Sequence, residues 1–264
     1  MSAEPTNAPA EDGRSEDAPI RSRADGKDVS IIVRAMHHLS DRRDVVVWQG
    51  DPVTPGPELR FATAAGSGRD EELRSLRTEL VMRVGVRRNK AAAFAVLGAG
   101  LGEGRSQLCG ELALAFAQLS GRTLLVDADL RNPKLSSMFI GARADLGLTE
   151  VLLGQCKTVP LHPVVGSPNL ALLTAGTRPL NPVDLLSGGQ FERLMRDWSR
   201  AYDYVVIDTP PSKQFSDGVV IANAAHNVIL VARRNQTSFD DVKELQRRLN
   251  ATQARIIGAV LNDF

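Results

Sequence analysis

A glycine-rich turn between a short apolar run and an amphipathic helix constrains this chain more than any other feature. Residues 92–97 form the apolar run, and residues 98–106 then read GAGLGEGRS. The segment 105–119 repeats large apolar residues at helical spacing. Glycines let backbone N–H groups close around an anion, and the helix that follows points its positive end at it. A turn that only joins strand to helix is the alternative, but this position favours a phosphate-binding loop.

One residue departs from the phosphate-loop pattern [A/G]-x4-G-K-[ST]. Ala99 fills the first position, Gly104 the fixed glycine and Ser106 the hydroxyl, but Arg105 replaces the lysine. Lysine is a compact charge that fits between β- and γ-phosphates, whereas arginine is a longer planar fork. Arginine can still bind phosphate, but in a geometry less suited to in-line transfer. The loop therefore predicts nucleotide binding with weakened phosphoryl transfer.

Carboxylates end two further apolar runs. Residues 124–131 read LLVDADLR and supply Asp127 and Asp129, while residues 204–211 read YVVIDTPP and supply Asp208. Ligands of open α/β sheets bind at the carboxyl ends of the strands. Such carboxylates can hold Mg²⁺ or accept a proton from an attacking hydroxyl. A solvated strand-end turn is the alternative for the first pair; the order of the three motifs favours the functional interpretation.

Apolar strands alternate with amphipathic helices from residue 70 onward. This alternation predicts a parallel sheet covered on both faces, that is, a doubly wound, mainly parallel α/β fold of the P-loop type. Helices are expected over 70–84 and 105–119, from Asn181-Pro182, and from a capping box at Ser238. Further strands are expected at 123–126, 170–173, 204–207, 228–231 and 256–261.

The length of 264 residues fits one such domain with extensions. We expect the domain over 69–264, a disordered tail over 1–28, and an N-terminal extension and linker over 29–66 that the sequence leaves open. The net charge of +1 gives no field for nucleic acid, and the 2 cysteines fit a reducing compartment. No signal peptide or membrane-spanning run is recognised. The expectation is a cytoplasmic domain that reaches the membrane through a partner.

The motif set resembles the bacterial tyrosine kinases (BY-kinases) of capsule and exopolysaccharide assembly, within the larger MinD/ParA-like P-loop group. The resemblance covers residues 69–264 and is greatest to the stand-alone, EpsG-type chain-length-determinant kinases. It is carried by the loop at 102–106, by DADLRNP at 127–133 and by DTPP at 208–211. Glu71-x-x-Arg74-x-x-Arg77 resembles the subunit-contact motif of these kinases, with a solvated charged face as the alternative. The MinD/ParA signature lysine would fall at Gly100 and is absent.

The resemblance implies a site for ATP or ADP with Mg²⁺. Ser106, Asp127 and Asp208 would hold the metal, and Asp127 or Asp129 would accept the tyrosine proton, with Arg105 as the third catalytic group. The nucleotide-binding residues would be Ala99, Gly100, Leu101, Gly102, Glu103, Gly104, Arg105, Ser106, Gln107 and, against the adenine, Asn262.

The resemblance also implies partners. Glu71, Arg74 and Arg77 would form the interface of a homo-oligomer, and a membrane chain-length-determinant protein (a polysaccharide co-polymerase) would activate the domain. The family's C-terminal tyrosine cluster is missing, since Tyr202 and Tyr204 are the only tyrosines. Two alternatives therefore stay open beside a tyrosine kinase that regulates polysaccharide export: a nucleotide-binding pseudokinase that acts as an assembly scaffold, and a MinD/ParA-like positioning ATPase.

Overall fold

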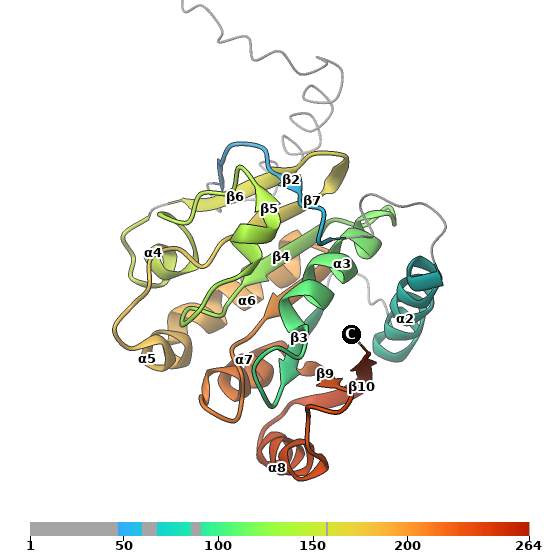
Figure 1. The fold of residues 1–264 in the computed structure, drawn as a ribbon. Helices are drawn as coiled ribbons and strands as arrows, with labels where there is room; N and C mark the ends of the chain where they lie inside the picture. The colour runs from blue at the N-terminus through green and yellow to red at the C-terminus, as the bar shows by residue number, and fades with distance from the viewer. Residues whose placement is uncertain (1–46, 60–67, 86–90, 157, 264) are drawn as a thin grey trace, which may run out of the picture.

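The computed structural model describes residues 47–59, 68–85, 91–156 and 158–263. Its centre is an 8-stranded sheet with the order β1-β6-β7-β4-β8-β3-β9-β10 (Figure 1). The strands of this sheet are β1 (Val47–Gln49), β3 (Ala92–Gly98), β4 (Thr123–Asp127), β6 (Val159–Val164), β7 (Ser167–Leu173), β8 (Tyr204–Asp208), β9 (Asn227–Arg233) and β10 (Arg255–Asn262). The mainly parallel doubly wound α/β fold is thereby confirmed.

All neighbouring strands of the sheet are parallel except β6 and β7, which are antiparallel. The sequence predicts no strand at β6, because Pro160 and Pro163 interrupt it. Proline cannot donate a ladder hydrogen bond and therefore argues against a strand away from an edge. Here β6 is flanked on its other side by the short β1 and by a single bridge between Val53 and Val164.

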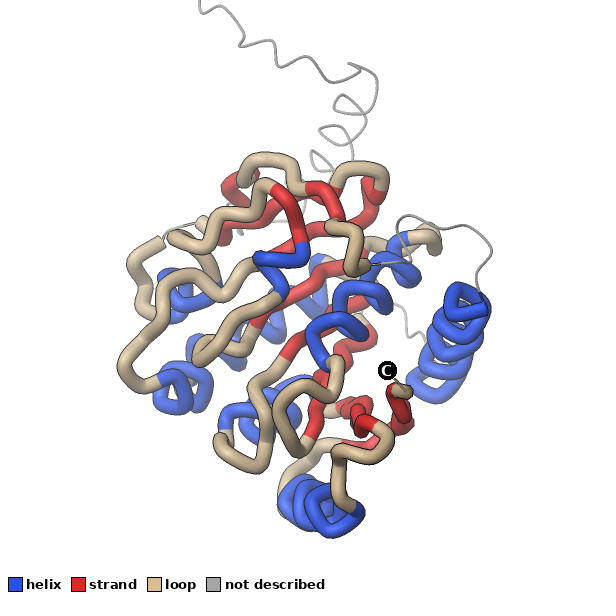
Figure 2. Tube along the Cα trace, in the orientation of Figure 1, coloured by secondary structure: helices blue, strands red, loops and turns tan. Residues whose placement is uncertain are grey.

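Side chains of β3 alternate between two cores, one on each face of the sheet. Phe94 and Val96 pack with helices α2 (Gly68–Val84) and α3 (Arg105–Ala117). Ala95 and Leu97 pack with the helices on the other face. Figure 2 shows the strands running between these two helical layers. The helices of the second face are α4 (Leu148–Leu152), α5 (Pro182–Ser187), α6 (Gly189–Ala201), α7 (Asp217–Ala225) and α8 (Phe239–Asn250).

Two details of the helices differ from expectation. The helix predicted to begin at Asn181-Pro182 ends at Ser187, and a second one begins at Gly189, because the backbone of Gly188 is extended (φ −71°, ψ 148°). Helix α7 was not predicted, since its apolar residues run directly into β9. None of the described helices is long and apolar enough to cross a membrane.

Part of the region expected as an extension and linker belongs to the sheet. Strand β1 pairs with β6, and the two-residue strand β2 (Thr54–Pro55) pairs with β5 (Phe139–Ile140), which follows the 3₁₀ turn η2 (Leu135–Met138). Leu59 is fully buried against Gly110 of α3. Residues 47–59 therefore complete the edge of the fold. The expected tail over 1–28 lies outside the described residues, and the domain boundary at 69 remains a prediction.

Candidate nucleotide-binding site

The glycine-rich turn joins β3 to α3 in the way the sequence predicts. Gly102 and Gly104 have φ of 70° and 89°, a left-handed conformation that glycine adopts without strain. Gly104 is also the residue before α3, and no side chain caps the helix there. The first N–H groups of α3 are therefore available to an anion, which is the arrangement that binds phosphate in such loops.

Residues at the end of β9 and just after it hold this loop in place, and none of them is among the site residues that the sequence predicts. The Gln236 side chain donates to the carbonyl of Leu101 at 2.8 Å, and Arg233 donates to the carbonyl of Gly102 at 3.2 Å. The Thr237 hydroxyl donates to Glu103 Oε1 at 2.6 Å. A usable signal was present, because these residues follow a predicted strand and so lie at the carboxyl edge of the sheet together with the loop.

Arg105 does not extend outward from the loop. Its side chain is only 8% exposed and pairs with Glu103, with 3.2 Å between Nη1 and Oε2. Nε donates to the carbonyl of Thr209 at 3.1 Å, and Nη1 also donates to the carbonyl of Gly100. The guanidinium is thus held by the loop itself and by the end of β8.

The predicted carboxylates do come together at the carboxyl edge of the sheet. Asp127 and Asp208 are register partners on β4 and β8, and both are fully buried. The two oxygens of Asp127 accept the backbone N–H groups of Asp129 (3.2 Å) and Leu135 (3.1 Å). Oδ1 of Asp129 accepts those of Arg131 and Asn132. Backbone donors therefore fix the orientation of both carboxylates of the DADLR segment.

The electrostatics of this cluster follow from burial. Desolvation raises the pKa of Asp208 to about 6, although the hydrogen bond from Ser106 and the charge of Arg105 lower it. Desolvation, then the charges of Asp208 and Asp129, raise the pKa of Asp127 well above its ordinary value. Cys109 lies beneath them, with its Sγ 3.7 Å from Asp208 Oδ1, and burial raises the pKa of its thiol. A cation placed here would relieve the repulsion between these carboxylates.

The residues present fit Mg²⁺. Oδ2 of Asp208 is buried and has no hydrogen-bond partner among the described residues. The Ser106 hydroxyl is near enough to lower the pKa of the same carboxyl. No group of three or more His, Cys, Asp or Glu side chains that could hold a metal ion occurs in the described part of the chain. Mg²⁺ at a nucleotide site does not need such a cage, because phosphates and water complete its shell. Ser106 and Asp208 therefore supply the hydroxyl and carboxylate that such a site uses.

Arg131 of the DADLR segment links this edge to α7. Its Nε and Nη2 donate to the two oxygens of Asp217 at 3.0 and 3.1 Å, and its guanidinium lies 4.1 Å from the centre of the Phe215 ring. Asp217 is fully buried. The Arg131–Asp217 pair therefore ties the DADLR segment to the residues that follow DTPP.

Two residues predicted to contact nucleotide have other partners here. The Gln107 side chain donates to Glu58 O and to Glu111 Oε1, away from the loop. The Asn262 side chain donates to the backbone carbonyl of Glu103 at 2.7 Å. Asn262 therefore braces the phosphate loop from β10, and its contact with adenine remains a prediction.

The predicted subunit-contact residues lie on α2, and they differ in environment. The Glu71 side chain is 79% exposed, and Arg74 lies 3.5 Å from it. Arg77 instead donates to the carbonyl of Ala115 on α3 at 2.8 Å. Arg77 therefore contributes to attaching α2 to its own domain, whatever it contacts outside.

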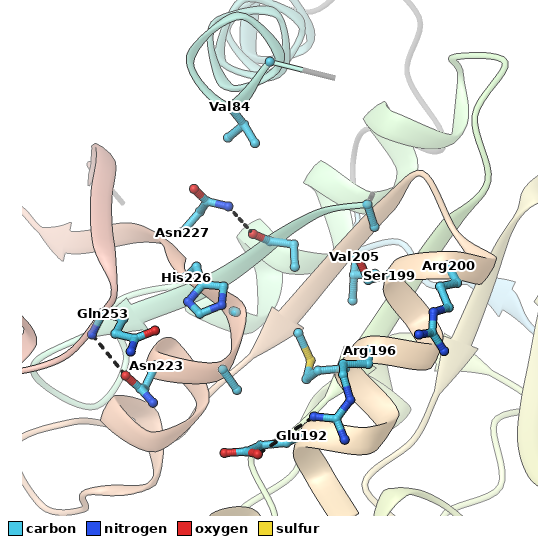
Figure 3. Close-up of a pocket in the computed structure, with 16 residues that line it drawn as sticks. Val84, Glu192, Arg196, Ser199, Arg200, Val205, Asn223, His226, Asn227 and Gln253 are labelled. Carbon is cyan, nitrogen blue, oxygen red and sulfur yellow. Dashed lines mark hydrogen bonds and ion pairs between the residues drawn. The ribbon is translucent and has the colours of Figure 1, made fainter. Parts of the chain in front are cut away.

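A groove of about 730 Å³ lies at the opposite edge of the sheet (Figure 3). It is bordered by Val84 of α2, Arg196 and Arg200 of α6, and His226 and Asn227 at the start of β9. These are the amino ends of the parallel strands, whereas the three acidic and glycine-rich motifs lie at the carboxyl ends. The groove is therefore separate from the candidate nucleotide site.

Known proteins with similar sequences are bacterial tyrosine kinases. The chain is 31% identical over 192 residues to tyrosine-protein kinase YwqD of Bacillus subtilis, which covers 73% of this chain and 80% of that one. It is 34% identical over 196 residues to tyrosine-protein kinase ptk of Acinetobacter johnsonii, covering 74% of this chain but only 26% of the relative. No family model matches the chain.

Solved structures agree with the sequence comparison. The chimerical protein CapA2B2 superposes with a TM-score of 0.71 at 26% identity, covering 87% of this chain and 97% of that one. A cobyrinic acid a,c-diamide synthase of Mycobacterium smegmatis, solved with ADP and magnesium, shares the fold (TM-score 0.56, 22% identity, 65% and 74% covered). Given these similarities and the three motifs at one edge of the sheet, the chain belongs to the bacterial tyrosine kinase family.

Proposed function

We propose that this chain binds ATP or ADP with Mg²⁺ and transfers the γ-phosphoryl group to tyrosine of another protein. The observation that carries the proposal is the in-register pair Asp127–Asp208, which stands beside Ser106 at the start of α3. Backbone N–H groups and the positive end of α3 bind the phosphates, and Ser106 and Asp208 hold the metal. Mg²⁺ supplies charge neutralisation on the phosphates when bound.

Asp129 accepts the proton of the attacking tyrosine in this proposal. Asp127 is fully buried and both its oxygens accept backbone N–H groups, so it supports the metal side of the site from within. Asp129 is 8% exposed and takes both of its backbone N–H groups on Oδ1. Its other oxygen is therefore the better proton acceptor.

Arg105 makes this site slower than a lysine-bearing one. Phosphoryl transfer depends on placing the transferring group in line, and a misplacement of about 1 Å can cost about a hundredfold in rate. The guanidinium contacts Glu103, Gly100 and Thr209, so it must leave these partners to contact β- and γ-phosphates. Nucleotide binding is thus better supported than rapid turnover.

The biological setting follows from the family resemblance. The domain acts at the inner face of the plasma membrane, recruited and activated by a chain-length-determinant protein, and it regulates exopolysaccharide polymerisation and export. Its oligomer contacts run through Glu71, Arg74 and Arg77 on α2. The nearly neutral net charge of the chain argues against nucleic acid as the partner.

Transfer of labelled phosphate tests the kinase proposal. The purified chain is incubated with γ-labelled ATP, Mg²⁺, a tyrosine-containing copolymer and the cytoplasmic segment of a chain-length-determinant protein. We expect slow, Mg²⁺-dependent labelling of tyrosine that Asp208→Ala and Asp129→Asn remove. Binding of nucleotide without any phosphotyrosine overturns the kinase claim.

A pseudokinase scaffold is the second candidate, and the Glu103–Arg105 ion pair favours it. If Arg105 stays paired with Glu103, its guanidinium does not contact the phosphates, and the backbone N–H groups of the loop must bind them without it. In that case nucleotide occupancy changes oligomeric mass in light scattering while no phosphate is transferred. A MinD/ParA-like positioning ATPase would instead retain partitioning proteins in a pull-down.

A further inference from the structure

Glu103 and Arg105 form a buried ion pair within the phosphate loop. Their side chains are 1% and 8% exposed, and Nη1 lies 3.2 Å from Oε2. A charge buried this deeply is costly unless it is paired and hydrogen-bonded. The pair therefore removes the net positive charge that a phosphate loop normally offers to its ligand.

The carboxylate of Glu103 is anchored independently of Arg105. Its Oε1 accepts the Thr237 hydroxyl at 2.6 Å, and its backbone carbonyl accepts the Asn262 amide at 2.7 Å. The site has no space to spare, because a Cβ at Gly98 would lie 2.1 Å from Oε2 of Glu103. The Thr237 hydrogen bond therefore holds the Glu103 carboxylate in place without the help of Arg105.

Only part of the Arg105 guanidinium remains available to a ligand. Nε donates to Thr209, and Nη1 donates to Gly100 and Glu103. Nη2 makes no hydrogen bond to the described residues, so its two N–H donors are what a phosphate can engage without displacing Glu103. Bidentate binding of phosphate, which is the main strength of arginine, requires the pair to open.

From this geometry we propose that Glu103 is the positioning residue of the site: its carboxylate sets whether Arg105 reaches the phosphates, so nucleotide binding is in competition with the Glu103–Arg105 pair. The inference rests on the proposed nucleotide-binding function. The Glu103–Arg105 pair holds the guanidinium against the loop, and Mg²⁺·nucleotide would favour the form in which Arg105 contacts phosphate.

The test uses Glu103→Gln, which keeps the shape and the hydrogen-bond acceptor but removes the charge. Titration of Mg²⁺·ADP by calorimetry is expected to show binding tightened about tenfold, because the competing carboxylate is gone. The nucleotide-free variant is expected to melt about 5–10 °C lower, since Arg105 is left unpaired, and saturating Mg²⁺·ADP restores most of the loss.

Two controls separate positioning from general effects. Glu111→Gln neutralises a different buried glutamate, which lies on α3. The Glu111 carboxylate is 2.8 Å from Arg69 and is not part of the loop. It is expected to lower the melting temperature and leave nucleotide affinity unchanged. In an Arg105→Gln background, Glu103→Gln is expected to tighten binding only about two- to threefold, by loss of its charge alone.

Two results overturn the inference while nucleotide binding stands: Glu103→Gln binds Mg²⁺·ADP no more tightly than the native chain, or the gain is equally large without Arg105. If Glu103→Gln is too unstable for titration, its rise in melting temperature with Mg²⁺·ADP must exceed that of the native chain, and an equal or smaller rise also overturns it. Absence of binding by the native chain, Glu103→Gln and Arg105→Lys together removes the proposed function as well.

Discussion

Asp127 and Asp208 lie opposite each other in register on neighbouring parallel strands, and both are completely buried. Two carboxylates in this position repel each other, and neither can be solvated. The two carboxylates lie at the carboxyl ends of their strands, beside the phosphate loop that follows β3. In the proposed function, the unpartnered oxygen of Asp208 and the Ser106 hydroxyl offset this repulsion by binding a cation that arrives with nucleotide.

The first prediction concerns pH. Burial raises the pKa of Asp208 from 3.8 to about 6, so ionising this carboxyl costs the folded state. The stability it contributes is complete below about pH 4 and is lost as the pH rises through about 6. Metal-free Asp208→Asn should therefore be more stable than the native chain at pH 7.5, by roughly 1–3 kcal/mol, and nearly equal to it at pH 4.

Melting temperatures from pH 4 to 8, without metal, measure this effect. Asp240→Asn, at an exposed position in the first turn of α8, serves as the control and should leave the pH profile unchanged. A variant at position 208 that melts below the native chain at pH 7.5 would show that the ionised carboxylate stabilises the fold. Mg²⁺·ADP should bind the native chain more weakly below pH 6, where Asp208 is protonated.

Arg105→Lys tests whether arginine at the lysine position of the phosphate loop slows phosphoryl transfer. A lysine ammonium is small enough to sit between β- and γ-phosphates, so turnover of ATP should rise about ten- to a hundredfold. The affinity for Mg²⁺·ADP should change much less than the rate. Arg193→Lys, an exposed substitution on α6, controls for the exchange itself. A rate that stays the same or falls would mean that arginine is the productive residue here.

Substitutions on α2 separate assembly from stability. Arg74→Ala with Arg77→Ala should lower the oligomeric mass in light scattering. Arg77→Ala alone should also destabilise the chain by about 1 kcal/mol, because the hydrogen bond to Ala115 is lost. Exposed Arg247→Ala on α8 should change neither quantity by much. An unchanged mass in the double variant would show that this face of α2 is a solvated charged surface and not an oligomer interface.

Much of the fold was readable from the sequence because each buried strand is a continuous apolar run ending in a recognisable turn. The strands at 92–98, 123–127 and 204–208 were predicted to within one residue of the structure. β6 was missed because its prolines are atypical of a strand, and α7 because its apolar residues merge with those of β9. The start of α8 was predicted correctly, since Ser238 accepts the backbone N–H of Asp241.

The candidate site was predictable in its parts but not in its internal contacts. Motif spacing placed Asp127, Asp208 and the loop at one edge. Spacing says nothing, however, about which way a long side chain folds back. Arg105 and Glu103 are only two residues apart, so their pairing is set by how the loop folds back on itself. The bracing by Thr237, just after β9, and by Asn262 of β10 comes from residues more than 120 positions away along the chain.

Calorimetric titration of the native chain with Mg²⁺·ADP tests the central claim most directly. We predict one saturable site per chain, weakened when Mg²⁺ is withheld and abolished by Asp208→Ala. Heat-silent titrations with no rise in melting temperature, for both the native chain and Arg105→Lys, would contradict the assignment of this edge of the sheet as a nucleotide site.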